Sequence, residues 1–134
     1  MQDRIDALIQ KYPKLYAESY DVYVGPGWLV ILESLSAQIQ HHIDHTNSYI
    51  ERFGHTLKYP LEPVEQAVVL QVKEKFGGLR FYYDGGDSAI AGMVTMAEEW
   101  ASHTCEECGK PGKSRDLSWV KTLCDEHYEQ RKNK

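Results

Sequence analysis

Apolar residues recur at helical spacing over residues 28–53, the longest periodic segment of the chain. They form a single stripe at 3.6 residues per turn, so this segment is predicted to be one long amphipathic helix. Gly54 follows directly and is a natural end for the helix. The stripe comprises Leu32, Leu35, Ile39, Ile43, Ile50 and Phe53.

Two shorter helices are predicted on either side of this segment. The first covers residues 4–12, with Asp3 as its expected cap and Pro13 as its end. The second begins after Asp87 or Ser88 and ends near residue 103. Its apolar face consists of Ile90, Met93, Val94, Ala97, Trp100 and Ala101.

The segment between the long helix and the last of these, residues 64–84, allows two interpretations. Val68, Leu70 and Val72 occupy alternate positions, Gly77-Gly78 can turn the chain, and the alternation then resumes at Leu79, Phe81 and Tyr83. This pattern predicts a β-hairpin. The alternative is a helix over residues 64–76, because valine and phenylalanine also recur there at every fourth position. We favour the hairpin.

Most of the large aromatic side chains are expected to lie in the core, with polar atoms reaching partners. This expectation covers Tyr16, Tyr20, Tyr23, Trp28 and Trp100. Trp119 is instead expected to cover the C-terminal segment around the cysteines.

The cysteines carry the most specific chemical signal in the sequence. Cys105 and Cys108 form a CxxC pair. After fifteen intervening residues comes Cys124, which forms a CxxH pair with His127. Three thiolates and one imidazole satisfy the tetrahedral coordination that Zn²⁺ prefers. We therefore predict one zinc ion bound by these four residues. Because no coordination position remains open, the site is expected to be structural and not catalytic.

The order of elements around the four ligands resembles a treble-clef zinc finger: a knuckle, a hairpin, and a helix that donates the second pair. The predicted fold class is α+β, with a long amphipathic helix packed on a short antiparallel sheet and a C-terminal treble-clef-like zinc module. We expect residues 1–103 to form the body and residues 104–134 to form a zinc module continuous with it.

Two further groups of residues are candidates for a ligand or partner surface. His41, His42 and His45 lie close together in the long helix, and His41 and His45 are spaced to share one helix face, where they could chelate a second metal ion or form a polar ligand surface. Arg80 and Tyr82 alternate with the predicted core residues of the hairpin, so they are expected on its other face, where they could engage a phosphate, a carboxylate or a base. The corresponding structural interpretations are a solvated helix face and an ordinary hairpin.

Charge separates the two parts of the chain. Residues 1–103 carry 8 basic and 14 acidic side chains, whereas residues 104–134 carry 7 basic and 6 acidic ones, within a net charge of −5. An acidic body disfavours general binding to nucleic acid. No apolar run is long enough to span a membrane, and the N-terminus lacks a signal pattern, so we expect a cytoplasmic protein.

Three motifs together carry a resemblance to known proteins: Gln38–Asp44, Val72–Tyr83 and Thr122–His127. The chain resembles a family of small uncharacterised proteins of phages, prophages and their bacterial hosts. The resemblance implies the zinc site at the four matching ligands and a cytoplasmic setting in a bacterial host cell. Phage accessory proteins of this size often act by binding host machinery, and this class includes inhibitors of bacterial defence systems.

Three functions follow as expectations. The first is a non-enzymatic phage accessory protein that binds and inhibits a host protein through its acidic body. The second is a protein that sequesters a small nucleotide-like ligand through Arg80, Tyr82 and the histidines. The third is a nucleic-acid-binding zinc module that uses the basic residues Lys110, Lys113, Arg115 and Lys121. The sequence has no GxSxG motif and its thiols are assigned to metal, so catalysis has no positive support.

Overall fold

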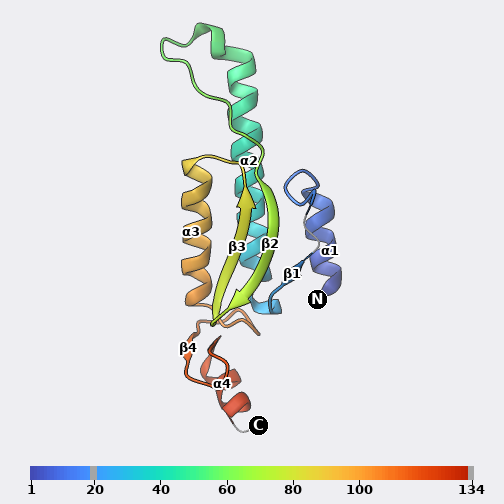
Figure 1. Ribbon diagram of the computed structural model, residues 1–134, viewed down its shortest axis with the longest axis vertical. Coiled ribbons are helices and arrows are strands. Elements are labelled where there is room, and N and C mark those ends of the chain that lie inside the picture. The colour runs from blue at the N-terminus through green and yellow to red at the C-terminus, as the bar shows by residue number, and fades with distance from the viewer. Residues whose placement is uncertain (19–20, 133–134) are drawn as a thin grey trace.

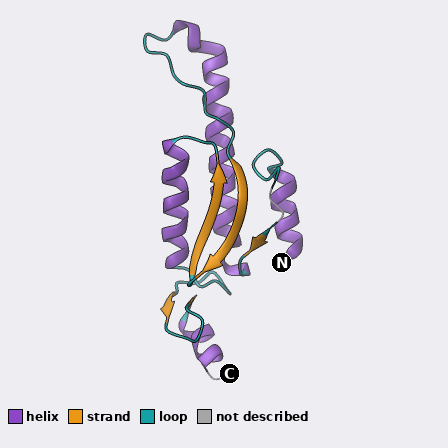
Figure 2. Ribbon diagram, in the orientation of Figure 1, coloured by secondary structure: helices purple, strands orange, loops and turns teal. Residues whose placement is uncertain are grey.

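The computed structural model describes residues 1–18 and 21–132, and it has the predicted α+β architecture (Figures 1 and 2). A three-stranded sheet packs against helices, and a small two-stranded hairpin and a helix follow at the C-terminal end. The elements are α1 (Gln2–Lys11), β1 (Val22–Tyr23), a 3₁₀ turn (Pro26–Trp28), α2 (Leu29–Phe53), a second 3₁₀ turn (Gly54–Thr56), β2 (Val68–Lys75), β3 (Gly78–Asp84), α3 (Ser88–Ser102), β4 (Lys113–Arg115), β5 (Lys121–Leu123) and α4 (Asp125–Lys132).

Helix α2 confirms the predicted long helix, but only its first half contributes to the core. Ile39 and Ile43 are buried, whereas Ile50 is half-buried and Phe53 is exposed. Figure 1 shows the reason: the distal half of α2 extends beyond the sheet, and the following loop runs back beside it. Asn47 joins the two, because its side-chain amide bonds both the N–H and the C=O of Val64.

Strands β2 and β3 form the predicted antiparallel hairpin, and the helical alternative is wrong. The turn lies at Phe76-Gly77, one residue earlier than predicted, and both residues have positive φ. A bulge between Val69 and Gln71 shifts the register. As a result Val69 faces the core, and Leu70, which an unbroken alternation would place on the same face as the buried Val72, is exposed. Strand β1 pairs with β2 in parallel and forms the edge of the sheet.

Of the two predicted N-terminal helix caps, the one on α3 is confirmed and the one on α1 is wrong. Asp87 caps α3 as predicted, and its carboxylate accepts a hydrogen bond from the N–H of Ile90 at 3.0 Å. Asp3 does not cap α1. The helix begins one residue after Met1, so Asp3 lies inside the first turn, where its charge favours the positive end of the helix dipole.

The aromatic residues divide between the core and the surface. Trp28 is fully buried, and the Tyr16 hydroxyl lies 2.7 Å from the Ser36 hydroxyl inside the core. Burial raises the pKa of Tyr16 to about 12. The core prediction is wrong for Tyr23, which is 67% exposed, because none of the described elements packs over it. Tyr20 lies outside the described residues.

Among residues 1–18 and 21–132, none of the helices combines the length and apolar composition that a membrane span requires.

Candidate metal centre

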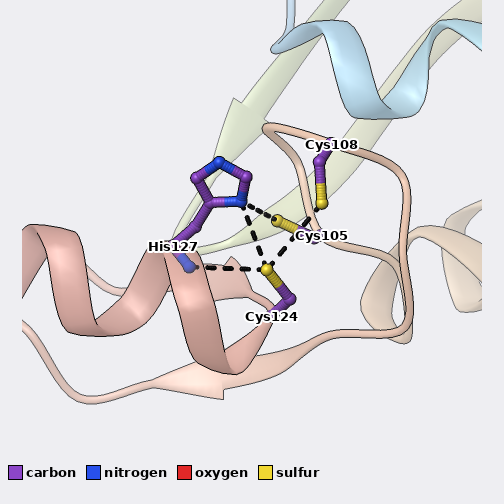
Figure 3. Close-up of side chains that lie close together, drawn as sticks. All are labelled: Cys105, Cys108, Cys124 and His127. Atoms are coloured by element: carbon purple, nitrogen blue, oxygen red, sulfur yellow. Dashed lines mark hydrogen bonds between the residues drawn. The ribbon is translucent and has the colours of Figure 1, made fainter.

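Cys105, Cys108, Cys124 and His127 converge at the C-terminal end of the molecule (Figure 3). Their ligand atoms all lie within 4.8 Å of one another. The Nδ1 atom of His127 is 3.6 Å from the sulfur of Cys105 and 3.2 Å from that of Cys124, and the sulfurs of Cys108 and Cys124 are 3.8 Å apart. A metal with bonds of about 2.0–2.3 Å to each ligand requires separations in this range. The four residues could therefore hold one metal ion.

Two local structures bring these ligands together. The first is a knuckle in which the N–H of Gly109 donates to the carbonyl oxygen of Cys105 at 2.9 Å. Gly109 has a φ of +82°, which glycine adopts without strain. The second is the start of α4: Cys124 directly precedes the helix, and His127 follows in its first turn. The spacing of three residues places both side chains on one side of that turn.

Neighbouring residues surround the ligands. The Nε2 atom of His127 lies 3.7 Å from the carboxylate of Glu107, within ion-pair range but longer than a hydrogen bond. Leu123 is fully buried beside Cys105, and Tyr128 packs against this small cluster. The guanidinium of Arg115 lies over the Tyr128 ring at 4.6 Å. The ligands are therefore held on a small apolar cluster of their own.

The backbone around Cys105 favours its thiolate form. Burial by itself disfavours the charged form, but backbone hydrogen bonds from the segment around Cys108 and Cys124 outweigh it. The net effect holds the pKa of Cys105 below its usual range. Metals bind the thiolate, so the protein prepares this residue for coordination.

The module that carries the ligands is seated on the 3₁₀ turn before α2. The N–H of Gly27 donates to the carbonyl oxygen of Glu106 at 2.7 Å, and that of Gly25 donates to its carboxylate at 2.9 Å. The indole N–H of Trp28 donates to the carbonyl oxygen of Thr104 at 2.9 Å. These three hydrogen bonds fix the position of the knuckle relative to the core.

The tip of the β2–β3 hairpin holds the module from its other side. The hydroxyl of Thr122 donates to the carbonyl oxygen of Gly77 at 2.7 Å. The ammonium of Lys121 lies 2.8 Å from the carboxylate of Glu74 and 3.5 Å from that of Glu106. The metal ligands thus lie where an early turn, the central hairpin and the C-terminal helix meet.

The structure does not unite the histidines into a further metal site. The rings of His41 and His45 stack at 5.4 Å on the exposed side of α2, and His42 bonds to Asp87 at 2.8 Å. Within the described residues, the cysteine cluster is the one group of three or more metal-binding side chains whose ligand atoms lie close together. The bond from His42 connects α2 to the cap of α3.

Arg80 and Tyr82 lie on the outward face of the sheet, as their alternation predicts, and both are exposed. His41 lies about 180° around α2 from the buried Ile39–Ile43 side, which faces the protein core. The histidines and the Arg80–Tyr82 pair are therefore on separate surfaces. Arg80 and Tyr82 lie on β3 and the histidines on α2. Sequestration of a nucleotide-like ligand by these residues stays a prediction.

The basic residues of the module are only partly available for nucleic acid. Arg115 is buried and bonds the carbonyl oxygen of Leu123 and the carboxylate of Asp125. Lys121 is engaged with Glu74 and Glu106. The prediction that Trp119 covers the segment around the cysteines is wrong, because its side chain is 81% exposed.

Two surfaces were not identified from the sequence. One is an apolar groove between α2 and α3 with a volume of about 160 Å³, bordered by Met93, Met96 and Trp100. The sequence places Trp100 on the core face of α3, but it is 44% exposed at the rim of this groove. The other is the extension of the Arg80–Tyr82 surface onto β1 and β2. The alternation of residues 71–75 could have shown that Lys73 and Lys75 lie on this surface. It could not show that β1 pairs with β2 and extends the surface to Tyr23.

The donor set indicates what the centre can do. Three sulfurs and one imidazole nitrogen complete a tetrahedral shell, so a bound metal would have no position for a substrate or a reactive water. A metal held by these four residues would therefore contribute to stability.

Comparison with known proteins finds no family model, no curated protein and no solved structure that matches this chain.

Proposed function

We propose that this chain is a small zinc-stabilised accessory protein of phage or prophage type that binds, and thereby inhibits, a protein of its bacterial host. The observation that carries the proposal is the apolar groove between α2 and α3. Its inner wall is formed by Ile31 and Leu35, and its outer wall by Met93, Met96 and Trp100.

The residue types of the groove support a protein partner. Methionine and tryptophan are enriched at the centres of protein interfaces, and flexible methionine side chains adapt to a partner's shape. Met96 is 69% exposed, so none of residues 1–18 and 21–132 covers it. The groove would accept the apolar side chains of one helix or extended segment from another protein.

Charge supports a partner with basic residues around that segment. The chain carries a net charge of −5, and Glu99 lies on α3 beside Trp100. Complementary charge speeds encounter and selects among partners. Reversal of Glu99 to lysine should therefore slow association with the partner.

Zinc is the metal that the donor set fits best. Thiolates and imidazole in tetrahedral geometry are typical of structural zinc, whereas Mg²⁺ and Ca²⁺ prefer oxygen ligands. Cys105, Cys108, Cys124 and His127 would hold it, and the metal would supply folding energy to the C-terminal module.

Site-specific photo-crosslinking tests the docking surface. A benzophenone amino acid is introduced in place of Met96, in the groove, or in place of Ala91, which is exposed on another side of α3. Both proteins are expressed in a bacterial host and irradiated. We expect a discrete adduct with another protein from position 96 and none from position 91. That adduct should be lost when Trp100→Glu is added.

Two results would contradict this proposal. An adduct of twice the chain mass would show that the groove binds a second copy. The absence of any adduct from position 96, in cells where the protein retains its metal, would show that no partner docks there.

A further inference from the structure

The outward face of the three-stranded sheet is a continuous surface with an unusual combination of side chains. Figure 2 shows β2 and β3 in front of α2, so this face is turned away from the helix that covers the sheet. Strand pairing places Tyr23, Lys73 and Arg80 side by side in one row across β1, β2 and β3. Tyr82 pairs with Gln71 in the next row. Val72, Phe81 and the other alternate residues point into the core.

Aromatic and basic groups are interleaved on this face. The ammonium of Lys73 lies 5.9 Å from the centre of the Tyr82 ring, and that of Lys75 lies 5.7 Å from the centre of the Phe76 ring. Within the described part of the chain, Lys73, Lys75 and Arg80 form no ion pair. Three unneutralised cations thus gather on one face of a chain whose net charge is −5.

Phe76 gives this surface an independent sign of function. It has a φ of +54°, in the left-handed region that an aromatic residue adopts only at a cost. Its side chain is 75% exposed, so packing within the chain does not compensate for that conformation. Strain that stability does not require is found preferentially where a side chain is presented to a ligand.

The face also leads into a recess. A hollow of about 570 Å³ adjoins the edge strand, and Tyr23 and Lys73 form part of its wall. Glu74, Glu106 and Lys121 also line it, and both carboxylates pair with the Lys121 ammonium. A ligand lying across the sheet could therefore extend past β1 into this recess while Tyr23 and Lys73 contact it at the rim.

We infer that this face, formed by Tyr23, Lys73, Lys75, Phe76, Arg80 and Tyr82, binds single-stranded nucleic acid. Exposed aromatic rings on a sheet stack unpaired bases, and basic side chains between them contact the phosphates. Three rings and three cations match a stretch of about three nucleotides. The site differs from the basic residues of the C-terminal module, of which Arg115 and Lys121 are engaged internally. It is also independent of the proposed protein partner, because it lies away from the α2–α3 groove.

Fluorescence anisotropy with a labelled ten-nucleotide oligo(U), the matching oligo(dT) and a duplex of equal length tests this inference. We expect binding to one or both single strands in 50 mM salt and much weaker binding to the duplex. If three phosphates are neutralised, affinity should fall about 20-fold between 50 and 200 mM salt. The ratio of RNA to DNA affinity identifies the natural ligand.

The variants separate stacking from simple charge attraction. Tyr82→Ala, Phe76→Asn and Arg80→Ala should each weaken binding about 10-fold or more. Lys113→Ala is the matched control, because Lys113 is an exposed lysine of β4 outside this face, and it should leave affinity unchanged. Metal content and melting temperature are measured for every variant, so that a folding defect is recognised.

Several results would overturn the inference. It fails if no single strand binds in 50 mM salt, or if Lys113→Ala weakens binding more than Arg80→Ala does. It also fails if Tyr82→Ala and Phe76→Asn bind as the parent does, or if an acidic peptide binds more tightly than either oligonucleotide. Unchanged binding by the two ring variants would indicate attraction by charge alone, and tighter binding of the peptide would indicate a protein-binding surface.

Discussion

The indole N–H of Trp28 donates a hydrogen bond to the carbonyl oxygen of Thr104, which lies 76 residues further along the chain. Trp28 is fully buried at the start of α2, and Thr104 directly precedes the first metal ligand. The bond therefore links the centre of the core to the beginning of the metal-binding module. Substitutions at this junction should affect both parts of the protein.

Gly27→Ala should be strongly destabilising. A methyl group at this position would lie 2.1 Å from the carbonyl oxygen of Cys105 and 2.5 Å from the nitrogen of Gly109, and both are backbone atoms. We expect the free energy of unfolding to fall by about 3 kcal/mol or more, measured by urea denaturation. Gly92→Ala is the control. A methyl group added at Gly92 in α3 would meet no side chain and no backbone of another element within 4 Å, so alanine should stabilise the helix by about 0.5–1 kcal/mol. Equal effects at the two positions would contradict the close seating of the knuckle.

Removal of the metal should unfold the module before the body. Native mass spectrometry should find one zinc ion per chain, and none in Cys124→Ser. In that variant, hydrogen exchange should become fast over residues 104–132 while β2 and β3 remain protected. The reason is that the module has only a small apolar cluster around Leu123, whereas the hairpin belongs to the main core. Retention of zinc by Cys124→Ser, or unchanged exchange over the module, would count against a structural site.

The His42–Asp87 bond should make stability depend on acid pH. The hydrogen bond from His42 lowers the pKa of Asp87, and the N–H of Ile90 adds to this against the opposing effect of partial burial. A carboxyl group with a lower pKa in the folded state stabilises the protein above its unfolded pKa, near 3.9, and loses this contribution as pH falls through the folded value. Asp87→Asn keeps a good helix cap and removes the charge.

Chemical denaturation at several pH values measures this effect. The parent should be more stable than Asp87→Asn at pH 6, and the difference should shrink as pH falls below about 4. Asp84→Asn changes a nearby exposed carboxylate and serves as the control. A difference between the parent and Asp87→Asn that is constant from pH 6 to pH 3 would show that the charge of Asp87 contributes nothing.

Phe76→Asn should raise stability. Asparagine tolerates positive φ far better than phenylalanine, and the exposed ring contributes little packing. We expect a gain of about 1 kcal/mol, or about 3–5 °C in melting temperature, measured by calorimetry. Phe76→Ala removes the same ring without favouring positive φ and should change stability much less. If Phe76→Asn lowers the melting temperature, the turn is not strained at this residue.

Local patterns were sufficient to predict several parts of this protein. The stripe of α2, the β2–β3 hairpin and the cap at Asp87 each depend on residues a few positions apart. The cluster of Cys105, Cys108, Cys124 and His127 was also predictable, because the CxxC and CxxH spacings each bring two donors to one turn of the chain. In each case the chemistry of neighbouring residues determines the structure.

The tertiary structure decided which surfaces are covered and which residues meet. Whether Tyr23 and Trp100 are buried depends on whether another element packs over them, and none of the described elements does. Leu70 became exposed because a bulge shifted the register of its strand, which the alternating pattern did not reveal.

His41 and Arg80 were both predicted to be accessible, but only the packing of α2 against the sheet places them on different sides. The seat of the metal module on Gly27 likewise requires two segments far apart in sequence to be in contact. Periodicity describes one element at a time, whereas burial and proximity are properties of several elements packed together.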